Sequence, residues 1–125
     1  MPTADAMRAT IDSYIDAYKR ADKDAAVACF HPEAVWHDPV GQPPHAGHAG
    51  IREFWDEARQ LASEIELVPT SIYFCGDEAA MIFDIITTVG ESRLMMQAVE
   101  TFRFDDDALF VEARAYWDPA NMRPV

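Results

Sequence analysis

The segment from residue 79 to residue 89 is apolar on both of its alternating faces, and this pattern constrains the fold more than any other. One parity holds Met81, Phe83 and Ile85, and the other holds Ala80, Ile82 and Ile86. Successive side chains of a strand point to opposite faces, so such a strand needs an apolar cover on both sides. Helices can supply one cover. The simplest second cover is another copy of the chain, so we expect a homodimer through the sheet.

Three predicted helices can supply the first cover. In residues 4–20, apolar side chains recur at intervals of three and four, which places them on one helix face. A short second helix is expected over residues 22–30, capped by Asp22 and ended by Pro32. The third helix runs from about residue 51 to residue 61.

Strands account for most of the remaining chain. The patterns predict strands over residues 33–38, 65–75 with a break at Pro69, 79–89, 93–104 and 109–117. The intervening stretch 39–50 is rich in Gly and Pro and is interpreted as an ordered loop. This order indicates an α+β fold, with helices packed on one face of a strongly bent, mostly antiparallel sheet. Because no repeat or linker interrupts it, we expect a single domain over residues 1–125.

The charge balance excludes several classes of partner. Ten Lys and Arg against 22 Asp and Glu give a formal net charge of -12, which repels phosphate backbones and anionic lipid. We therefore expect no nucleic-acid partner and no membrane partner. The first residues lack the basic and apolar regions of a signal peptide. Cys29 and Cys75 form no paired motif and are interpreted as reduced thiols, so a cytoplasmic location is expected.

Glu100 is the acid that strand parity most clearly places inside the protein. It shares its parity with Met96, Ala98, Phe102 and Phe104. A carboxyl group in such surroundings loses hydration, which disfavours its charged form and raises its pKa. A slipped register, or burial beside an Arg, would give Glu100 an ordinary structural role. The pattern alone leaves these alternatives open.

Two further acids and one tyrosine are candidates for a site. Asp38 shares a parity with Trp36 and directly precedes Pro39. It either starts a turn or stands at the mouth of a pocket, with a pKa near its normal value. Asp84 faces either the pocket or the dimer seam. Tyr14 either fills the core or directs its hydroxyl into a cavity.

Motifs for metals and cofactors are weak. His45 and His48 lie on the Gly-rich loop without a nearby third ligand, and there is no CxxC pair, phosphate-binding loop or Ser nucleophile motif. We expect neither a metal nor an organic cofactor.

A series of short motifs runs from the first predicted helix to the last predicted strand. These motifs are Tyr14, Asp38-Pro-Val-Gly-Gln-Pro-Pro44, Ile51-Arg-Glu-Phe54, Glu100-Thr-Phe-Arg-Phe104 and Ala115-Tyr-Trp117 followed by Asn121. Together they resemble the bacterial Δ5-3-ketosteroid isomerases of the nuclear-transport-factor-2-like, or SnoaL-like, superfamily. The resemblance implies a cone-shaped α+β barrel that is usually dimeric.

The resemblance also implies roles for three residues. Asp38 matches the general base that moves a proton from C4 to C6 of a 3-oxo-Δ5-steroid through a dienolate. Tyr14 and a protonated Glu100 would donate hydrogen bonds to the enolate oxygen, although the family has Asp at the latter position. Trp55 stands where a family Tyr often supports the oxyanion tyrosine, so Tyr14 is expected to lack a phenolic partner.

A substrate pocket is implied as well. Trp117 matches an aromatic side chain near the base, and the other expected substrate-binding residues are Trp55, Phe30, Phe102 and Ile82. The expected ligand is a steroid or another small hydrophobic ketone.

Other functions of the superfamily remain open. A SnoaL-like cyclase would use Asp38 as the base of an aldol closure, and a non-catalytic dimer would only bind a hydrophobic ligand. An epoxide-opening relative would need an Arg between two pocket carboxylates, but Arg103 and Arg114 lie on parities that face away from the cavity. A dehydratase-like relative would need interior His residues, which the strands do not provide.

Overall fold

Helix α1 (Ala4–Arg20) has the limits that its periodicity predicts. Thr3 caps its first turn, because the Thr3 side chain accepts a hydrogen bond from the backbone N–H of Ala6 at 3.1 Å. The helix ends at Ala21, which takes the left-handed conformation with φ of 54°. The buried face of α1 includes Tyr14, so this helix delivers the first candidate side chain to the interior.

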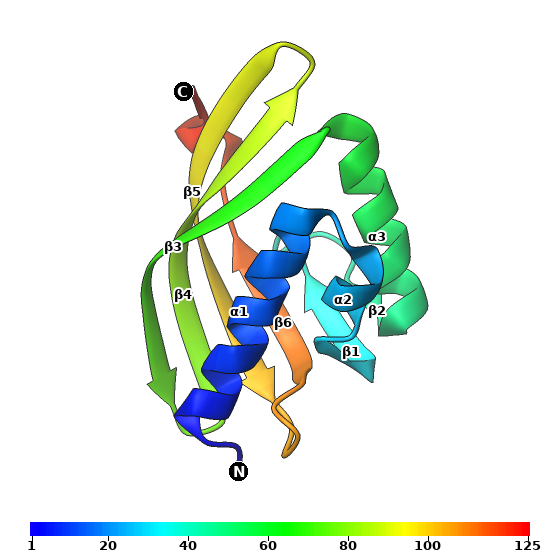
Figure 1. Cartoon of the computed structure of the whole chain (residues 1–125), viewed down its shortest axis with the longest axis vertical. Coiled ribbons are helices and arrows are strands. Elements are labelled where there is room, and N and C mark those ends of the chain that lie inside the picture. The colour runs from blue at the N-terminus through cyan, green and yellow to red at the C-terminus, as the bar shows by residue number, and fades with distance from the viewer.

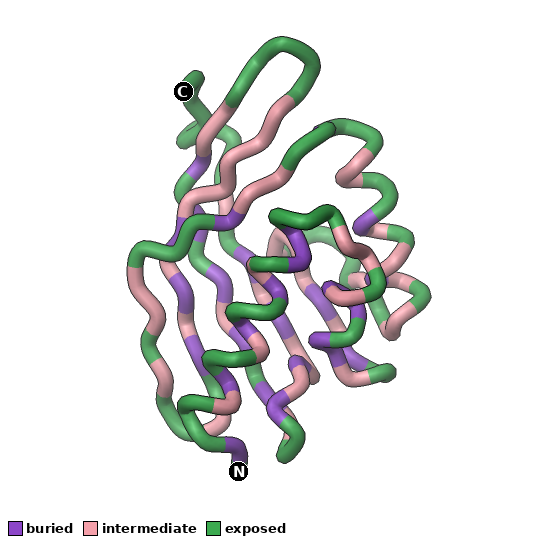
Figure 2. The backbone as a smooth tube through the Cα atoms, viewed as in Figure 1, coloured by how far each residue is buried: buried purple, intermediate pink, exposed green.

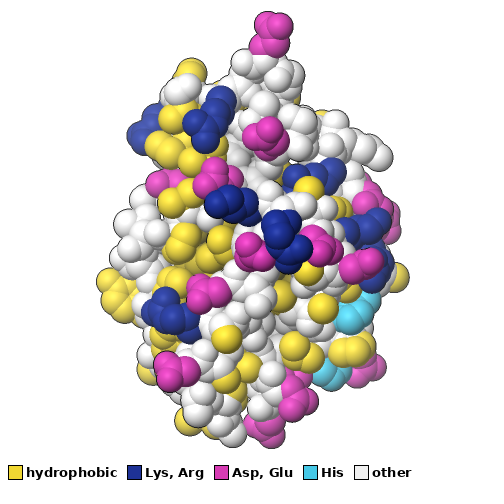
Figure 3. Space-filling model, viewed as in Figure 1, with side chains coloured by type: hydrophobic (Ala, Val, Ile, Leu, Met, Phe, Trp, Pro, Cys, Tyr) yellow, Lys and Arg dark blue, Asp and Glu magenta, His cyan; other side chains and the backbone are white.

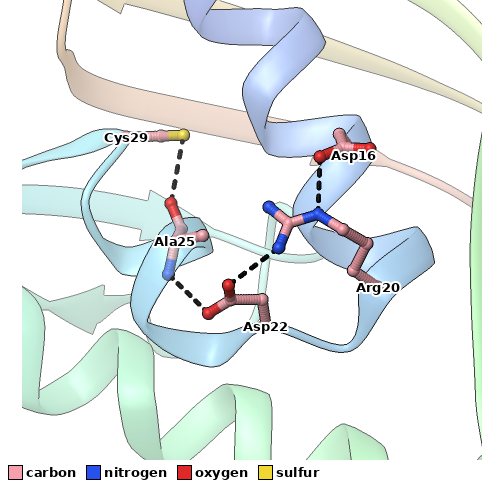
Figure 4. A network of polar contacts seen from close by, with 5 residues as sticks. All are labelled: Asp16, Arg20, Asp22, Ala25 and Cys29. Atoms are coloured by element: carbon pink, nitrogen blue, oxygen red, sulfur yellow. Dashed lines mark hydrogen bonds and ion pairs between the residues drawn. The ribbon is translucent and has the colours of Figure 1, made fainter.

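The junction between the first two helices is held by a small polar network (Figure 4). Asp22 accepts a hydrogen bond from the backbone N–H of Ala25 at 3.0 Å and is the predicted cap of the second helix. Arg20 donates to Asp22 at 2.9 Å and to Asp16 at 2.7 Å. These contacts fix the sharp turn between the two helices.

Helix α2 (Lys23–Val27) is shorter than the predicted 22–30, and Pro32 does not end it. Strand β1 (Phe30–His37) has already begun two residues before Pro32. Phe30 pairs with Phe110, and the register of β1 shifts between Phe30 and Val35. Pro32 lies in this irregular part, where a missing N–H is tolerated.

Helix α3 (Gly47–Leu61) begins four residues earlier than predicted, inside the stretch assigned to a loop. The two residues before it form the short strand β2 (His45–Ala46), which pairs with β1. His48 Nε2 lies 2.8 Å from the carbonyl oxygen of Phe30, a contact that ties the first turn of α3 to β1. The Gly-rich stretch is therefore ordered, as expected, but more of it is regular structure.

The long strands agree with prediction to within one or two residues. They are β3 (Glu64–Cys75), β4 (Glu78–Val89), β5 (Ser92–Phe104) and β6 (Phe110–Tyr116), followed by a 3₁₀ turn, η1 (Pro119–Asn121), and the short β7 (Arg123–Pro124). The register of β3 against β4 shifts between Pro69 and Ser71, which is the predicted break.

The structure, a computed structural model that describes all 125 residues, arranges these strands in one curved, open sheet with the helices on one face (Figure 1). The strand order is β2-β1-β6-β5-β4-β3, and β7 pairs with β5. β1 and β6 run parallel, and all other pairs are antiparallel. The expected α+β architecture is confirmed.

The two faces of β4 differ in burial. Met81 and Phe83 are almost fully buried beneath the helices, whereas Ile82 and Ile86 on the other face are only half-buried. Figure 2 shows the same alternation of buried and exposed stretches along the strands. The predicted second subunit on the outer face stays a prediction.

The helix-bearing surface has no patch of one charge sign on the side shown in Figure 3, where acidic and basic side chains lie next to one another. None of the helices combines the length and the hydropathy of a membrane span.

Candidate active site

A cavity of about 160 Å³ lies between α1, α3 and the inner face of the sheet. Hydrophobic residues, Tyr14 and Tyr18 among them, make up 11 of its 14 lining residues, and the other three are Asp38, Thr87 and Glu100. Two carboxyl groups thus share a small apolar space. In such a space, charges are poorly screened and the protonation of one group affects the other.

Asp38 reaches the cavity from the end of β1. Its Oδ1 accepts a hydrogen bond of 2.6 Å from the indole Nε1 of Trp117, which follows β6. The parallel pairing of β1 with β6 brings these residues together across 79 positions of sequence. Burial raises the pKa of Asp38 to about 6, and the Trp117 hydrogen bond lowers it in part. The expectation of a nearly normal pKa is wrong, because the half-buried Asp38 loses hydration beside the apolar side chains of the cavity.

Glu100 lies in the middle of β5 with its side chain turned inward, as the strand parity predicts, and is only 2% exposed. The indole Nε1 of Trp36 donates to Glu100 Oε2 at 3.0 Å. Burial is the main cause that raises the pKa of Glu100 well above its usual value, and the negative charge of Asp38 raises it further. The charge of either carboxyl group disfavours ionisation of the other in this shared apolar space.

Tyr14 and Tyr18 face the cavity from successive turns of α1. Their ring centroids are 5.1 Å apart. Desolvation by burial raises the pKa of both phenols, and the nearby carboxyl groups contribute. Both hydroxyls therefore stay protonated and can donate hydrogen bonds. Tyr14 does have a phenolic neighbour that the sequence analysis did not identify, because the ring of Tyr18 packs edge-on against it.

The structure brings together four of the residues predicted from sequence: Asp38, Tyr14, Glu100 and Trp117. It does not place the other four in the cavity lining. Phe30 and Phe102 are core residues that pack around the ring of Tyr14. Trp55 packs on Tyr18, with ring centroids 4.7 Å apart. Ile82 has the opposite parity from the buried Met81 and Phe83 and lies on the outer face.

The walls of the cavity were largely missed by sequence reasoning. They include Phe54 and Ala58 from α3, Ile65 and Leu67 from β3, and Phe83 and Ile85 from β4. The alternation along the strands predicts that several of these side chains point inward, as core residues do. Nothing in the sequence distinguishes a core residue that touches a cavity from one that touches another side chain.

Arg59 was also missed, although it lies close to the phenols. Its guanidinium stacks over the ring of Trp55 at 4.6 Å, and its Nη2 donates to the backbone oxygen of Tyr18 at 3.0 Å. Partial burial lowers the pKa of Arg59, and the interaction with Tyr18 opposes this shift. Neither Arg59 nor the predicted outward pair, Arg103 and Arg114, lines the cavity, so no Arg stands between the two carboxyls.

The remaining polar candidates lie elsewhere. Asp84, which the sequence left undecided, lies in a separate polar pocket with Gln97 and Arg123. His45 stacks on Phe54 with ring centroids 4.2 Å apart. No group of three His, Cys, Asp or Glu side chains is arranged to hold a metal ion.

An open, curved α+β fold with two carboxyl groups and two phenols in one apolar cavity is typical of one class: small domains that enclose a small molecule beside groups able to exchange protons. The chain belongs to the SnoaL-like domain family, whose model matches residues 11–113. The steroid Delta-isomerase of Nocardioides simplex is 28% identical over 116 residues, which cover 93% of each chain.

Two solved structures share the fold over the full length of both chains. The epoxide hydrolase/cyclase-like enzyme SalBIII, described for its role in pyran ring formation in the polyether salinomycin, has a TM-score of 0.90 at 21% identity. RV0760c from Mycobacterium tuberculosis has a TM-score of 0.88 at 18% identity. At these identities the likeness concerns the fold and leaves the chemistry open.

Proposed function

We propose that this protein is a cofactor-independent isomerase that moves a proton between two carbons of a β,γ-unsaturated ketone, in the manner of a steroid Delta-isomerase. One observation carries the proposal: Asp38 and Glu100 share an apolar cavity in which burial raises the pKa of both and the charge of Asp38 raises that of Glu100 further. In the proposal, Asp38 is the ionised partner and Glu100 is the protonated one. The similarity to a steroid Delta-isomerase supports it. A base and an acid whose pKa values are driven apart are what this reaction requires.

In the proposed reaction, a carboxylate oxygen of Asp38 takes the proton from the carbon between the carbonyl and the double bond. For a 3-oxo-Δ5-steroid this carbon is C4. The electron pair of the broken C–H bond moves into a dienolate, whose oxygen accepts hydrogen bonds from Tyr14 and from neutral Glu100. Asp38 then returns the proton to C6, and the double bond moves into conjugation with the carbonyl.

The environment of the cavity favours each step. A base with a pKa of about 6 is ionised near neutral pH and still accepts a proton effectively. Two neutral donors in an apolar space stabilise a developing oxyanion more than water does. Tyr18, which contacts Tyr14 across 5.1 Å between ring centroids, supports the phenol that meets the ligand.

The size of the cavity bears on the substrate class. Its volume of about 160 Å³ is below the roughly 300–1,000 Å³ of sites that enclose a drug-sized ligand. The cavity therefore fits the reacting ring, whereas the distant rings of a steroid would lie at its mouth. We expect turnover of both 5-androstene-3,17-dione and the single-ring ketone 3-cyclohexenone.

The first test is the absorbance of the conjugated enone product. Asp38→Asn removes the base with little change in shape, and should lower kcat by about 100-fold or more, while ligand affinity stays close to that of the unmodified protein. Asp12→Asn is the matched control, because Asp12 is exposed on α1, and it should leave turnover unchanged. Turnover by Asp38→Asn at the parent rate would show that Asp38 is not the base.

A SnoaL-like cyclase and a non-catalytic binding protein are the alternatives. The same assay distinguishes them, because neither converts a β,γ-unsaturated ketone into a conjugated enone. Binding of both ketones without any change in absorbance would favour the binding protein.

A further inference from the structure

The side chain of Trp36 crosses one whole strand to reach Glu100. In the sheet, β6 lies between β1, which carries Trp36, and β5, which carries Glu100. The inward residues of β6 at this level are Ala113 and Ala115, which are paired with Trp36 and Glu100 respectively. Because both are alanines, the indole can lie across β6 and donate to Glu100 Oε2 at 3.0 Å.

The indole has a fixed orientation. Its ring packs edge-on against Phe54 at 4.9 Å between centroids and lies tilted against Phe30 at 5.3 Å, and Trp36 is only 1% exposed. An indole that is held by close packing on several sides cannot turn its N–H toward another acceptor without displacing its neighbours. The Trp36 N–H is thus committed to one oxygen of Glu100.

The two oxygens of Glu100 therefore differ. Oε2 receives the indole N–H, which is a donor only. Oε1 has no hydrogen-bond partner in the protein. It is not fully enclosed, however, because Arg59 Nε is the one side-chain polar atom that is both fully buried and without a partner. Because Glu100 lines the cavity, Oε1 is the oxygen that faces a ligand.

We propose that Trp36 is a positioning residue for the proton of Glu100: its indole N–H holds Oε2 as the acceptor, so the neutral carboxyl carries its proton on Oε1 and presents it to the cavity. A neutral carboxyl group has one donor oxygen and one better acceptor oxygen. An N–H donor fixed beside one oxygen makes that oxygen the acceptor and leaves the proton on the other oxygen. The inference rests on the proposed function in one respect: the ligand atom that accepts the hydrogen bond from Glu100 is an enolate or phenolate oxygen.

This contact also bears on the length of the Glu100 side chain. Glu has one more methylene than Asp and one more rotatable bond, so a free Glu side chain would hold its proton less precisely. An oxyanion donor must lie within about 3 Å of the developing charge. Anchoring Oε2 at Trp36 removes the additional freedom at the far end of the side chain.

The direct test is the infrared C=O stretch of the protonated Glu100. This band should be present in the unmodified protein at neutral pH and absent in Glu100→Gln. In Trp36→Phe, which keeps an aromatic ring and removes the N–H, the band should shift to higher wavenumber, because the C=O oxygen loses its donor. Trp55→Phe is the control, since it removes another buried indole that contacts neither carboxyl, and it should leave the band in place.

The outcomes separate the two proposals. A band that is present but unmoved in Trp36→Phe overturns the role of Trp36 and leaves the isomerase proposal intact. A band that is missing from the unmodified protein overturns both, because Glu100 is then not a neutral donor.

A second test leaves Trp36 and its aromatic neighbours unchanged. In Glu100→Gln, the indole N–H should hold the amide oxygen at the Oε2 position and thereby turn the amide NH₂ toward the cavity. The variant should then bind 4-nitrophenol, a single-ring probe with a phenolic oxygen, about tenfold more tightly than Glu100→Met, which has similar size and no donor. Equal affinity of the Gln and Met variants would contradict the proposal, whether or not Trp36→Phe folds.

Discussion

Two opposing effects set the pKa of Asp38. Burial raises it to about 6 by disfavouring the charged carboxylate, and the hydrogen bond from Trp117 Nε1 lowers it in part by stabilising that charge. In our proposal the ionised form is the active base, so activity rises with pH through this pKa. We therefore expect the acidic limb of the pH profile of kcat/KM to lie near pH 6.

Trp117→Phe should move this acidic limb to higher pH. The substitution keeps an aromatic wall and removes the N–H, so ionised Asp38 loses a stabilising contact and its pKa rises by about one unit. The measurement is kcat/KM over the pH range in which the protein stays folded. The deficit of the variant should be largest at acidic pH and should shrink as the pH rises. An acidic limb that stays in place would show that Trp117 does not act on the base.

At the residue scale, sequence could locate the carboxyl groups but not their surroundings. Strand alternation is regular, so one parity argument placed Glu100 inside, and a short motif singled out Asp38. Tyr18 lies on the same helix face as Tyr14, and nothing in the helix pattern says which of them reaches a cavity. That depends on what packs opposite, here Trp55 against Tyr18. The unusual pKa of Asp38 depends likewise on the distant Trp117.

At the scale of elements, the left-handed residue Ala21 is the least favourable point of the junction between α1 and α2. Its φ is 54°. Gly adopts this left-handed conformation easily, whereas in a residue with a side chain the Cβ atom lies too close to the following carbonyl oxygen, which is energetically unfavourable. Its backbone N–H bonds to the carbonyl oxygens of Ala17 and Tyr18, so the conformation is needed to end α1. The strain lies next to the network of Arg20 and Asp22 in Figure 4.

Ala21→Gly should stabilise the protein by about 0.5–1 kcal/mol, because relief of the left-handed strain outweighs the added freedom of the unfolded chain. The free energy of unfolding in urea measures it. Ala9→Gly is the matched control, since Ala9 is exposed inside α1, and it should destabilise by about 1 kcal/mol. Destabilisation by both substitutions would contradict the assignment of strain at Ala21.

Element limits could be predicted where the pattern is regular and failed where it is not. The long strands and α1 repeat one periodicity over seven or more residues, and their limits agree with prediction to within one or two residues. Pro32 was assigned to a helix end, but it lies in an irregular stretch of β1 where the register shifts. Residues 45–50 look like a loop because of their glycines, yet residues 45–46 form β2 and residues 47–50 start α3, since contacts with β1 decide their conformation.

At the scale of the whole molecule, an apolar row crosses the outer face of the sheet. Ile82 of β4 is paired with Val99 of β5, and Val99 is paired with Tyr116 of β6. Val99 is 37% exposed and Tyr116 is 46% exposed. A row of apolar side chains across three strands is unusual on a surface that otherwise carries a net charge of -12. A second copy of the chain would bury the row without bringing in a new partner.

We therefore expect a homodimer whose sedimentation velocity at micromolar concentration corresponds to about twice the chain mass of 14.1 kDa. In a two-fold symmetric interface each substitution occurs twice. Val99→Asp should thus place two carboxylates in an apolar contact and shift the protein to monomer, because unpaired buried charges are costly. Leu61→Asp, at an exposed site at the end of α3, should leave the dimer intact. A monomer at this concentration before any substitution would mean that the outer face of β4 tolerates solvent, and that the double-sided apolar pattern does not require a second subunit.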